Sequence, residues 1–335
     1  MKVILPMEKN PMFLSRYESA VYFSVIQAQG KEILPWLSCQ MFNCHCSNDF
    51  VWRFDTIKNM SWYADVGVFF RKRYLYDCHI PGWNRPEVLD MLTEALDRGQ
   101  YVHTKLNTRF LPDDESFQSF SRNTEALIYG YDSEEKRFFF LRFLPDRGMT
   151  ECSAAFDELM KALCEKEDEK AVFDLLKFND AFPFRLNAKE LYNGIYDFLH
   201  STRQSAPLLA ADRIDRGVVC LQKLRTYLTQ VGVYYEYIDR KYYTAFYDFQ
   251  VAMGIRYGHL CEIGMIPKRP DTVLEAFRTA AEDFLLCCER YNRNREPSAL
   301  PAILRHFDAL LDRDISFSQE MLDALKLHLE GEIQG

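Results

Sequence analysis

The character of the sequence changes near residue 150, and this change constrains the fold more than any other feature. Before it, short runs with the alternating pattern of strands stand among a few helical segments. After it, nearly every segment has the apolar spacing of a helix. The 26 Phe and 19 Tyr allow each half to build its own core. The sequence therefore predicts an α+β domain over residues 1–150 and an all-helical domain over residues 151–330.

Three strands are expected in the first half, following two helices. Residues 101–111 alternate between apolar and polar side chains, and residues 126–131 form a nearly continuous apolar run. Residues 137–143 follow this run across the polar turn 132–135, and such a short turn joins antiparallel neighbours. The predicted order is helix, helix and then an antiparallel sheet.

The helices have recognisable start and stop signals. Residues 15–18 match a capping box, in which Ser15 and Glu18 satisfy the free amides of the first turn, and Gly30 ends that helix. A second helix is expected at about residues 86–97. The second half contains further helices, at about residues 187–199, 208–229, 240–261, 271–291, 300–311 and 318–329.

Composition excludes several classes of protein. The net charge of −8 is opposite to the field that a nucleic-acid-binding surface needs. No run of 18 apolar residues is present, so we expect no membrane span, and the first twelve residues lack the apolar core of a signal peptide. Ten irregularly spaced cysteines fit reduced thiols better than a disulfide framework. These features predict a cytoplasmic enzyme or interaction protein.

No metal or organic cofactor is expected. Cys44, His45 and Cys46 are consecutive, whereas structural zinc sites use ligand pairs two to four residues apart. We therefore interpret Cys44 and Cys46 as buried, reduced cysteines rather than as metal ligands. The chain has only 14 glycines, and no phosphate-binding fingerprint can be written from them. The acidic run 113–115 follows a proline and is predicted to be a solvated turn.

The run Arg71-Lys72-Arg73 is locally basic in an acidic chain, and two interpretations stay open. It is either an exposed turn or strand edge, or a docking patch for an acidic partner or a phosphate-bearing group.

Several short motifs together resemble the butirosin biosynthesis protein H family. In the first half they are 17–19 (Tyr-Glu-Ser), 109–112 (Arg-Phe-Leu-Pro) and 127–132 (Leu-Ile-Tyr-Gly-Tyr-Asp). In the second half they are 191–197 (Leu-Tyr-Asn-Gly-Ile-Tyr-Asp) and 238–240 (Ile-Asp-Arg). The resemblance covers most of the chain. It implies a papain-like cysteine-peptidase fold and a role in moving an acyl group from a carrier-protein thioester to an amine.

The same resemblance places the catalytic positions, and each carries an unexpected residue. The nucleophile position in the first turn of the opening helix is Ser19, where a cysteine is expected. The position of the base is Thr124, with Glu125 next to it, and the orienting group on the following strand is Arg142. A serine in this setting is a poor nucleophile unless a base removes its proton. The pattern indicates a lost or altered triad.

Two functions follow, and both stay open. In the first, the chain is a non-catalytic accessory protein of peptide natural-product biosynthesis that binds an acyl or peptidyl group held by a carrier protein, or binds a biosynthetic enzyme. In the second, it is an active acyltransferase or peptidase-like enzyme that uses Cys44 or Cys46. Adjacent residues of an extended chain point apart, so the partner of Cys44 is then His103 or His79 rather than His45. A helical binding protein outside this family is a third possibility.

Overall fold

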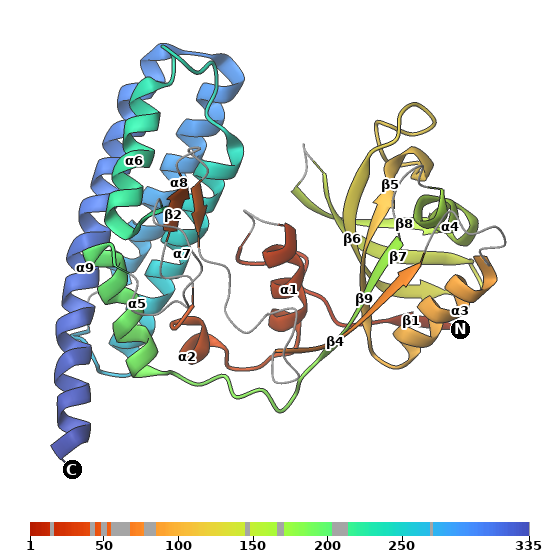
Figure 1. Ribbon diagram of the computed structural model, residues 1–335, viewed down its shortest axis with the longest axis horizontal. Coiled ribbons are helices and arrows are strands. Elements are labelled where there is room, and N and C mark those ends of the chain that lie inside the picture. Colours follow the sequence, from red (N-terminus) through yellow and green to blue (C-terminus); the bar gives the residue numbers. More distant parts are fainter. Residues whose placement is uncertain are drawn as a thin grey trace. The chain divides into compact units, whose positions relative to one another are not determined.

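The computed structural model describes residues 1–13, 17–40, 44–47, 52–54, 68–76, 85–144, 148–165, 171–202, 214–268 and 271–334. The chain forms two compact units, one from residues 1–31 and 59–182 and the other from residues 32–58 and 183–335 (Figure 1). The predicted α+β class, with an antiparallel sheet and a helical C-terminal region, is confirmed. The division differs from a single boundary at residue 150, because the chain passes between the units three times.

An antiparallel sheet organises the described part of the first unit. Its strand order is β4-β9-β5-β6-β7-β8, and β1 pairs with the end of β6. The strands are β1 (Lys2–Ile4), β4 (Phe69–Tyr76), β5 (Tyr101–Asn107), β6 (Asn123–Asp132), β7 (Arg137–Leu144), β8 (Gly148–Ala155) and β9 (Ala171–Phe178). Strand β8 contains the predicted boundary, and β9 lies between β4 and β5, so residues 151–182 belong to this unit.

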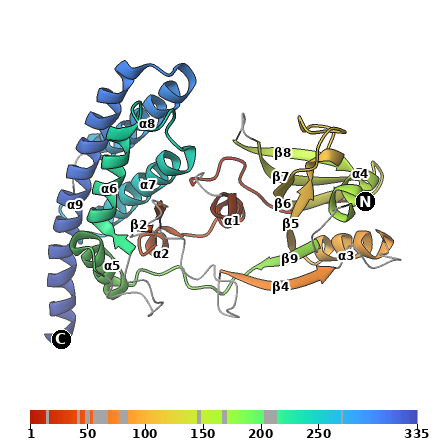
Figure 2. The same ribbon diagram turned by 45° about the horizontal axis from the view of Figure 1, so that its top comes forward.

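The two faces of the sheet carry different layers. Helices α3 (Arg85–Asp97) and α4 (Phe156–Cys164) cover one face, where Val102 and Leu106 of β5 join one hydrophobic cluster with α3 and α4 (Figure 2). His103 and Lys105 of β5 point to the opposite face, because side chains alternate along a strand. Helix α1 (Tyr17–Ala28) packs on that second face, where the ring of Tyr22 lies 5.4 Å from the ring of Phe69.

The sequence placed the end of β5 too late. The strand ends at Asn107, and a 3-10 helix, η1 (Thr108–Phe110), follows it. The side chain of Asn107 accepts a hydrogen bond from the backbone of Arg109, which turns the chain out of the sheet.

The second unit is mainly helical. Its helices are α2 (Leu34–Leu37), α5 (Ala188–His200), α6 (Gly217–Gln230), α7 (Arg240–Glu262), α8 (Asp271–Asn294) and α9 (Leu300–Gln334), and a 3-10 turn, η2 (Pro297–Ala299), precedes α9. A small sheet has the order β10-β2-β3, from β2 (Cys44–Ser47), β3 (Trp52–Phe54) and β10 (Ile214–Arg216). Phe246 of α7 stacks on Phe307 of α9, with ring centroids 4.7 Å apart.

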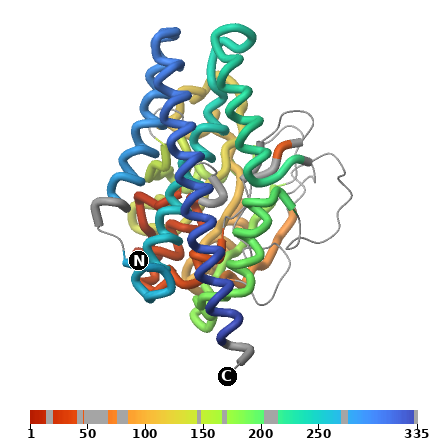
Figure 3. Tube along the Cα trace, turned by 90° about the vertical axis from the view of Figure 1, so that its left-hand side faces the viewer, coloured from red at the N-terminus to blue at the C-terminus, as the bar shows by residue number. Residues whose placement is uncertain are grey.

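The predicted helices of the second half exist, with one difference in their number. Asn187 caps α5 by accepting a hydrogen bond from the backbone of Glu190, as its position predicts. The two helices predicted at 300–311 and 318–329 form a single helix, α9, which runs along the unit in Figure 3. Polar residues interrupt the apolar pattern between them, but Asp314 there is fully buried. The predicted capping box at 15–18 lies partly outside the described residues, as does the start of the helix predicted at 208–229.

Among the described helices, none combines the length and the apolar composition that crossing a bilayer needs.

Candidate functional site

A histidine and a carboxylate meet on the face of the sheet that α1 covers. Nε2 of His103, on β5, lies 3.7 Å from Oε2 of Glu125, on the neighbouring β6. The ring of Tyr22, from α1, approaches the imidazole edge-on with a centroid distance of 6.3 Å. The imidazole is 7% exposed and the carboxylate 32% exposed. Hydrogen bonding to His103 lowers the pKa of the Glu125 carboxyl group, and it outweighs the partial burial, which alone would raise that pKa.

Charged residues continue from this pair across the sheet. Asp174 on β9 lies opposite His103 in register, and directly paired residues share a face. Arg71 and Arg73 of β4 both donate hydrogen bonds to Asp174. Burial alone would raise the pKa of Asp174, but the two guanidinium groups outweigh it and lower the pKa. The sheet face that α1 covers therefore holds a row of polar groups. It runs from the two arginines of β4 through Asp174 and His103 to Glu125.

The structure does not bring the four family positions together. Glu125 lies on the α1 face, beside His103. Thr124 is paired with Leu106, whose side chain belongs to the cluster under α3 and α4, so Thr124 points to the opposite face. Ser19 is a residue of α1, and its side chain lies outside the described part of the molecule.

Arg142 also points to the α3 and α4 face. It is paired with Ala126 of the same hydrophobic cluster, and it donates hydrogen bonds to Asp114 and to the sulfur of Cys152. Its guanidinium is 1% exposed. The orienting role expected for Arg142 therefore does not fit its position, because a buried ion pair occupies it. Asp114, predicted to lie in a solvated turn, is its buried partner.

The alternative pairs with His103 take their two residues from different units. Cys44 and Cys46 lie on β2 of the second unit, whereas His103 belongs to the first unit. Cys46 is fully buried, and burial raises the pKa of its thiol to about 11, so it is protonated at neutral pH. His79 and the side chains of Cys44 and His45 lie outside the described residues.

The other described thiols are also poorly placed for nucleophilic attack. Cys287 is half-buried, and the remaining ones are buried: Cys39, Cys152, Cys164, Cys220, Cys261 and Cys288. Thiols that are buried in the structure are inert. Within the described chain, no three His, Cys, Asp or Glu side chains come together as candidate metal ligands.

The Gly-Tyr-Asp motif has a structural role at each position. A Cβ atom at Gly130 would lie 2.6 Å from the carbonyl oxygen of Val3, so only glycine allows β1 to approach β6. The hydroxyl of Tyr131 donates to Asp97 of α3. The carboxylate of Asp132 accepts hydrogen bonds from the backbone at residues 134 and 135, which closes the β6–β7 turn. Packing and turn formation account for this motif.

Sequence reasoning did not pair His103 with Glu125. The two residues are 22 positions apart, and their contact depends on the register of β5 against β6, which aligns His103 with Leu127. Comparison of the sequence with protein-family models and with curated proteins finds no match.

Proposed function

We propose that the first unit is a papain-like domain in which thiol chemistry has been lost, and that the protein binds an acyl or peptidyl group held by a carrier protein. Its role would be that of an accessory protein in peptide natural-product biosynthesis. The motifs that resemble the butirosin biosynthesis protein H family suggest this pathway.

One observation carries the proposal: α1 packs, through Tyr22, on the sheet face that presents His103 and Glu125. In a papain-like enzyme the nucleophile lies at the start of such a helix, and an imidazole oriented by a third polar group faces it. Here the imidazole and a carboxylate are present, while the helix carries Ser19 at the nucleophile position. Amides at the start of a helix and an imidazole N–H are each suited to hold a carbonyl oxygen. This arrangement supports binding of an acyl group without attack on it.

A binding assay tests the proposal directly. The probe is a purified carrier domain whose phosphopantetheine arm carries an acetyl or dipeptidyl thioester, titrated against the full chain by calorimetry. We expect saturable binding, weakened about tenfold by His103→Gln, because the variant loses a hydrogen-bonding imidazole at the site. His200→Gln, which changes an exposed histidine of α5, is the matched control and should leave the affinity unchanged.

The same samples separate binding from catalysis. The thioester should remain intact, so no free thiol should appear when an amine acceptor is added. Absence of binding to the loaded carrier would contradict the proposal, and release of thiol would favour the active enzyme instead. A Ser19→Cys variant adds a positional check: rapid labelling of the new thiol by iodoacetamide below about pH 8 would support its place at an activating helix start.

A further inference from the structure

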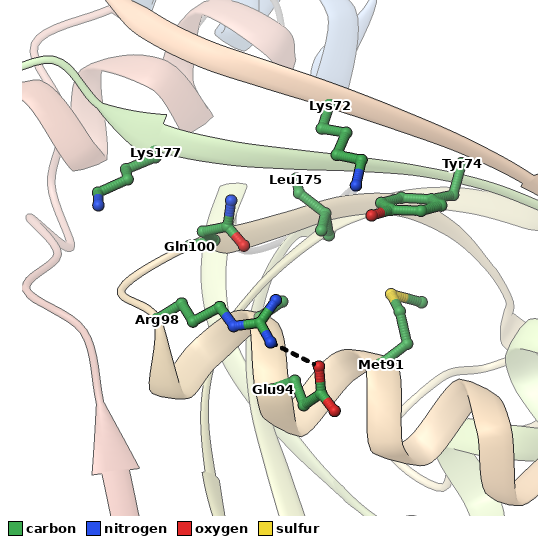
Figure 4. Close-up of a pocket in the computed structure, with 9 residues that line it drawn as sticks. Lys72, Tyr74, Met91, Glu94, Arg98, Gln100, Leu175 and Lys177 are labelled. Atoms are coloured by element: carbon green, nitrogen blue, oxygen red, sulfur yellow. Dashed lines mark hydrogen bonds and ion pairs between the residues drawn. The ribbon is translucent and has the colours of Figure 1, made fainter.

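The first unit has a pocket on the face of its sheet that α3 covers, the face opposite His103. Its volume is about 410 Å³, within the range of small-molecule sites. Figure 4 shows its walls: Lys72 and Tyr74 come from β4, Leu175 from β9, and Glu94 and Arg98 from the end of α3 and the residue after it. Edge strand β4 thus forms one wall and the end of a helix the other.

Alternation along β4 divides the basic run 71–73 between two faces. Arg71 and Arg73 point to the α1 face and are held by Asp174. Lys72 points to the other face, into the pocket, where its Nζ lies 4.7 Å from the centre of the Tyr74 ring. Of the three basic side chains, only Lys72 is therefore directed toward a ligand-sized space.

The pocket is positively charged in a chain whose net charge is −8. Lys72, Lys177 and Arg98 line it, against the single carboxylate of Glu94, which lies 3.0 Å from Arg98. Across the part of the chain that the structure describes, neither Lys72 nor Lys177 is in an ion pair; both are exposed to solvent. Among the described residues, a local surplus of positive charge therefore remains in the pocket.

The floor of the pocket is apolar. Leu175 and Ala95 are almost fully buried beneath it, and Met91 of α3 is half-buried at its side. The ring of Tyr74 adds an aromatic wall. A bare inorganic anion would leave this apolar surface wet, whereas an apolar body would cover it.

We infer that this pocket binds a small organic anion, with a carboxylate or phosphate head between Lys72 and Arg98 and an apolar body over Leu175 and Met91. The ammonium of Lys72 attracts the head as a point charge, and the guanidinium of Arg98 receives it in place of Glu94. Glu94 competes with the ligand for Arg98 and so weakens binding. This site is on the other face of the sheet from His103, and the inference does not depend on the proposed function.

Three related probes test the two halves of the ligand: 1-naphthoate, 1-naphthyl phosphate and the neutral 1-naphthamide, each titrated into the full chain at low salt. We expect both anions to bind at least about tenfold more tightly than the amide, and their relative affinity shows which head the site prefers. Inorganic phosphate alone should compete weakly, because it does not use the apolar floor.

Variants give changes of opposite sign. Lys72→Gln should weaken binding of the anions about tenfold, while Glu94→Gln should strengthen it several-fold by freeing Arg98. Lys326→Gln, at an exposed lysine of α9, is the matched control and should change nothing. Unfolding by urea confirms that each variant is folded. Equal affinity for the amide and the anions, an unchanged affinity of Lys72→Gln, or weaker binding by Glu94→Gln would each overturn the inference.

Discussion

The guanidinium of Arg142 donates a hydrogen bond to the carboxylate of Asp114, and their side chains are only 1% and 3% exposed. Asp114 also accepts hydrogen bonds from the backbone and the hydroxyl of Ser116. Burial alone would raise the pKa of Asp114, but these hydrogen bonds outweigh burial and lower it. The pair joins β7 to the segment after η1 and stabilises the core under α3 and α4.

Removing one partner of this pair should be costly. We expect Arg142→Met to lower the free energy of unfolding by about 3–5 kcal/mol, because it leaves the Asp114 carboxylate buried without its counter-ion. Urea denaturation measures the loss. The double variant Arg142→Met/Asp114→Asn should recover much of it, whereas Arg109→Met, at an exposed arginine, should cost little. A cost below about 1 kcal/mol for Arg142→Met would contradict the structural role.

The helical unit should become less stable as pH rises from acid to mildly alkaline values. Burial raises the pKa of Asp314 to about 8, against the opposing effects of the Gln250 hydrogen bond, 2.6 Å long, and the charges of Arg313 and Arg256. In the unfolded chain the pKa of an aspartate is about 4. Between these values the folded chain keeps a proton that the unfolded chain has lost, so the free energy of unfolding falls by up to about 1.4 kcal/mol per pH unit.

Substitution isolates this effect. Asp314→Asn imitates the protonated side chain, so its unfolding free energy should lack the fall that the unchanged protein shows between about pH 5 and pH 8. Urea titrations at several pH values measure the difference. Asp312→Asn removes an exposed carboxylate of the same helix and should keep the fall. Parallel pH profiles for the Asp314→Asn and unchanged proteins would refute the assignment.

Arg256 should hold residues 34–40 on helix α7. Its guanidinium is fully buried and donates to the carbonyl oxygens of Ser38 and Gln40, at 2.9 and 2.7 Å. Burial lowers the pKa of Arg256 to about 10, so the group remains charged at neutral pH. Arg256→Met should cost about 2–4 kcal/mol, since it leaves two carbonyl groups without donors. In Arg256→Met, amide hydrogen exchange at residues 34–40 should become faster. The control variant Arg305→Met changes an exposed arginine and should leave exchange at residues 34–40 unchanged. Unaltered exchange there would count against this anchor.

Gly130 should be required for the pairing of β1. In Gly130→Ala the new methyl group would meet the backbone of Val3 at 2.6 Å and of Ile4 at 3.2 Å, so we expect a loss of about 1–3 kcal/mol. In Gly254→Ala the nearest atom, on Phe277, is 3.5 Å away, and the change in a helix should be neutral or stabilising. Deleting residues 1–4 should abolish the added cost of Gly130→Ala. Persistence of the full cost after that deletion would show a different cause.

Cys46 should react slowly with iodoacetamide. Its burial and raised pKa leave almost no thiolate at neutral pH, so mass spectrometry should find it labelled much later than the half-buried Cys287. Labelling of Cys46 at the rate of a free thiol would instead favour the alternative function, an active enzyme that uses this cysteine.

The sequence alone determined most of the helices and three of the strands. Alternation predicted a strand near β5, a nearly continuous apolar run predicted β6, and the short polar turn after it predicted β7. The capping residue Asn187 marked α5, and the apolar spacing of the second half predicted its helices. These signals depend on neighbours along the chain. Strand β9 was missed because its apolar run is too short to separate a strand from a helix by periodicity.

Only the tertiary structure decided which residues meet. Strand register placed Glu125 beside His103, but sent Thr124 and Arg142 to the opposite face of the sheet. A shift of one residue in a strand exchanges its two faces, and no local pattern fixes the register between strands distant in sequence. The chemistry on each face therefore depends on long-range pairing, which the spacing of residues along the chain does not encode.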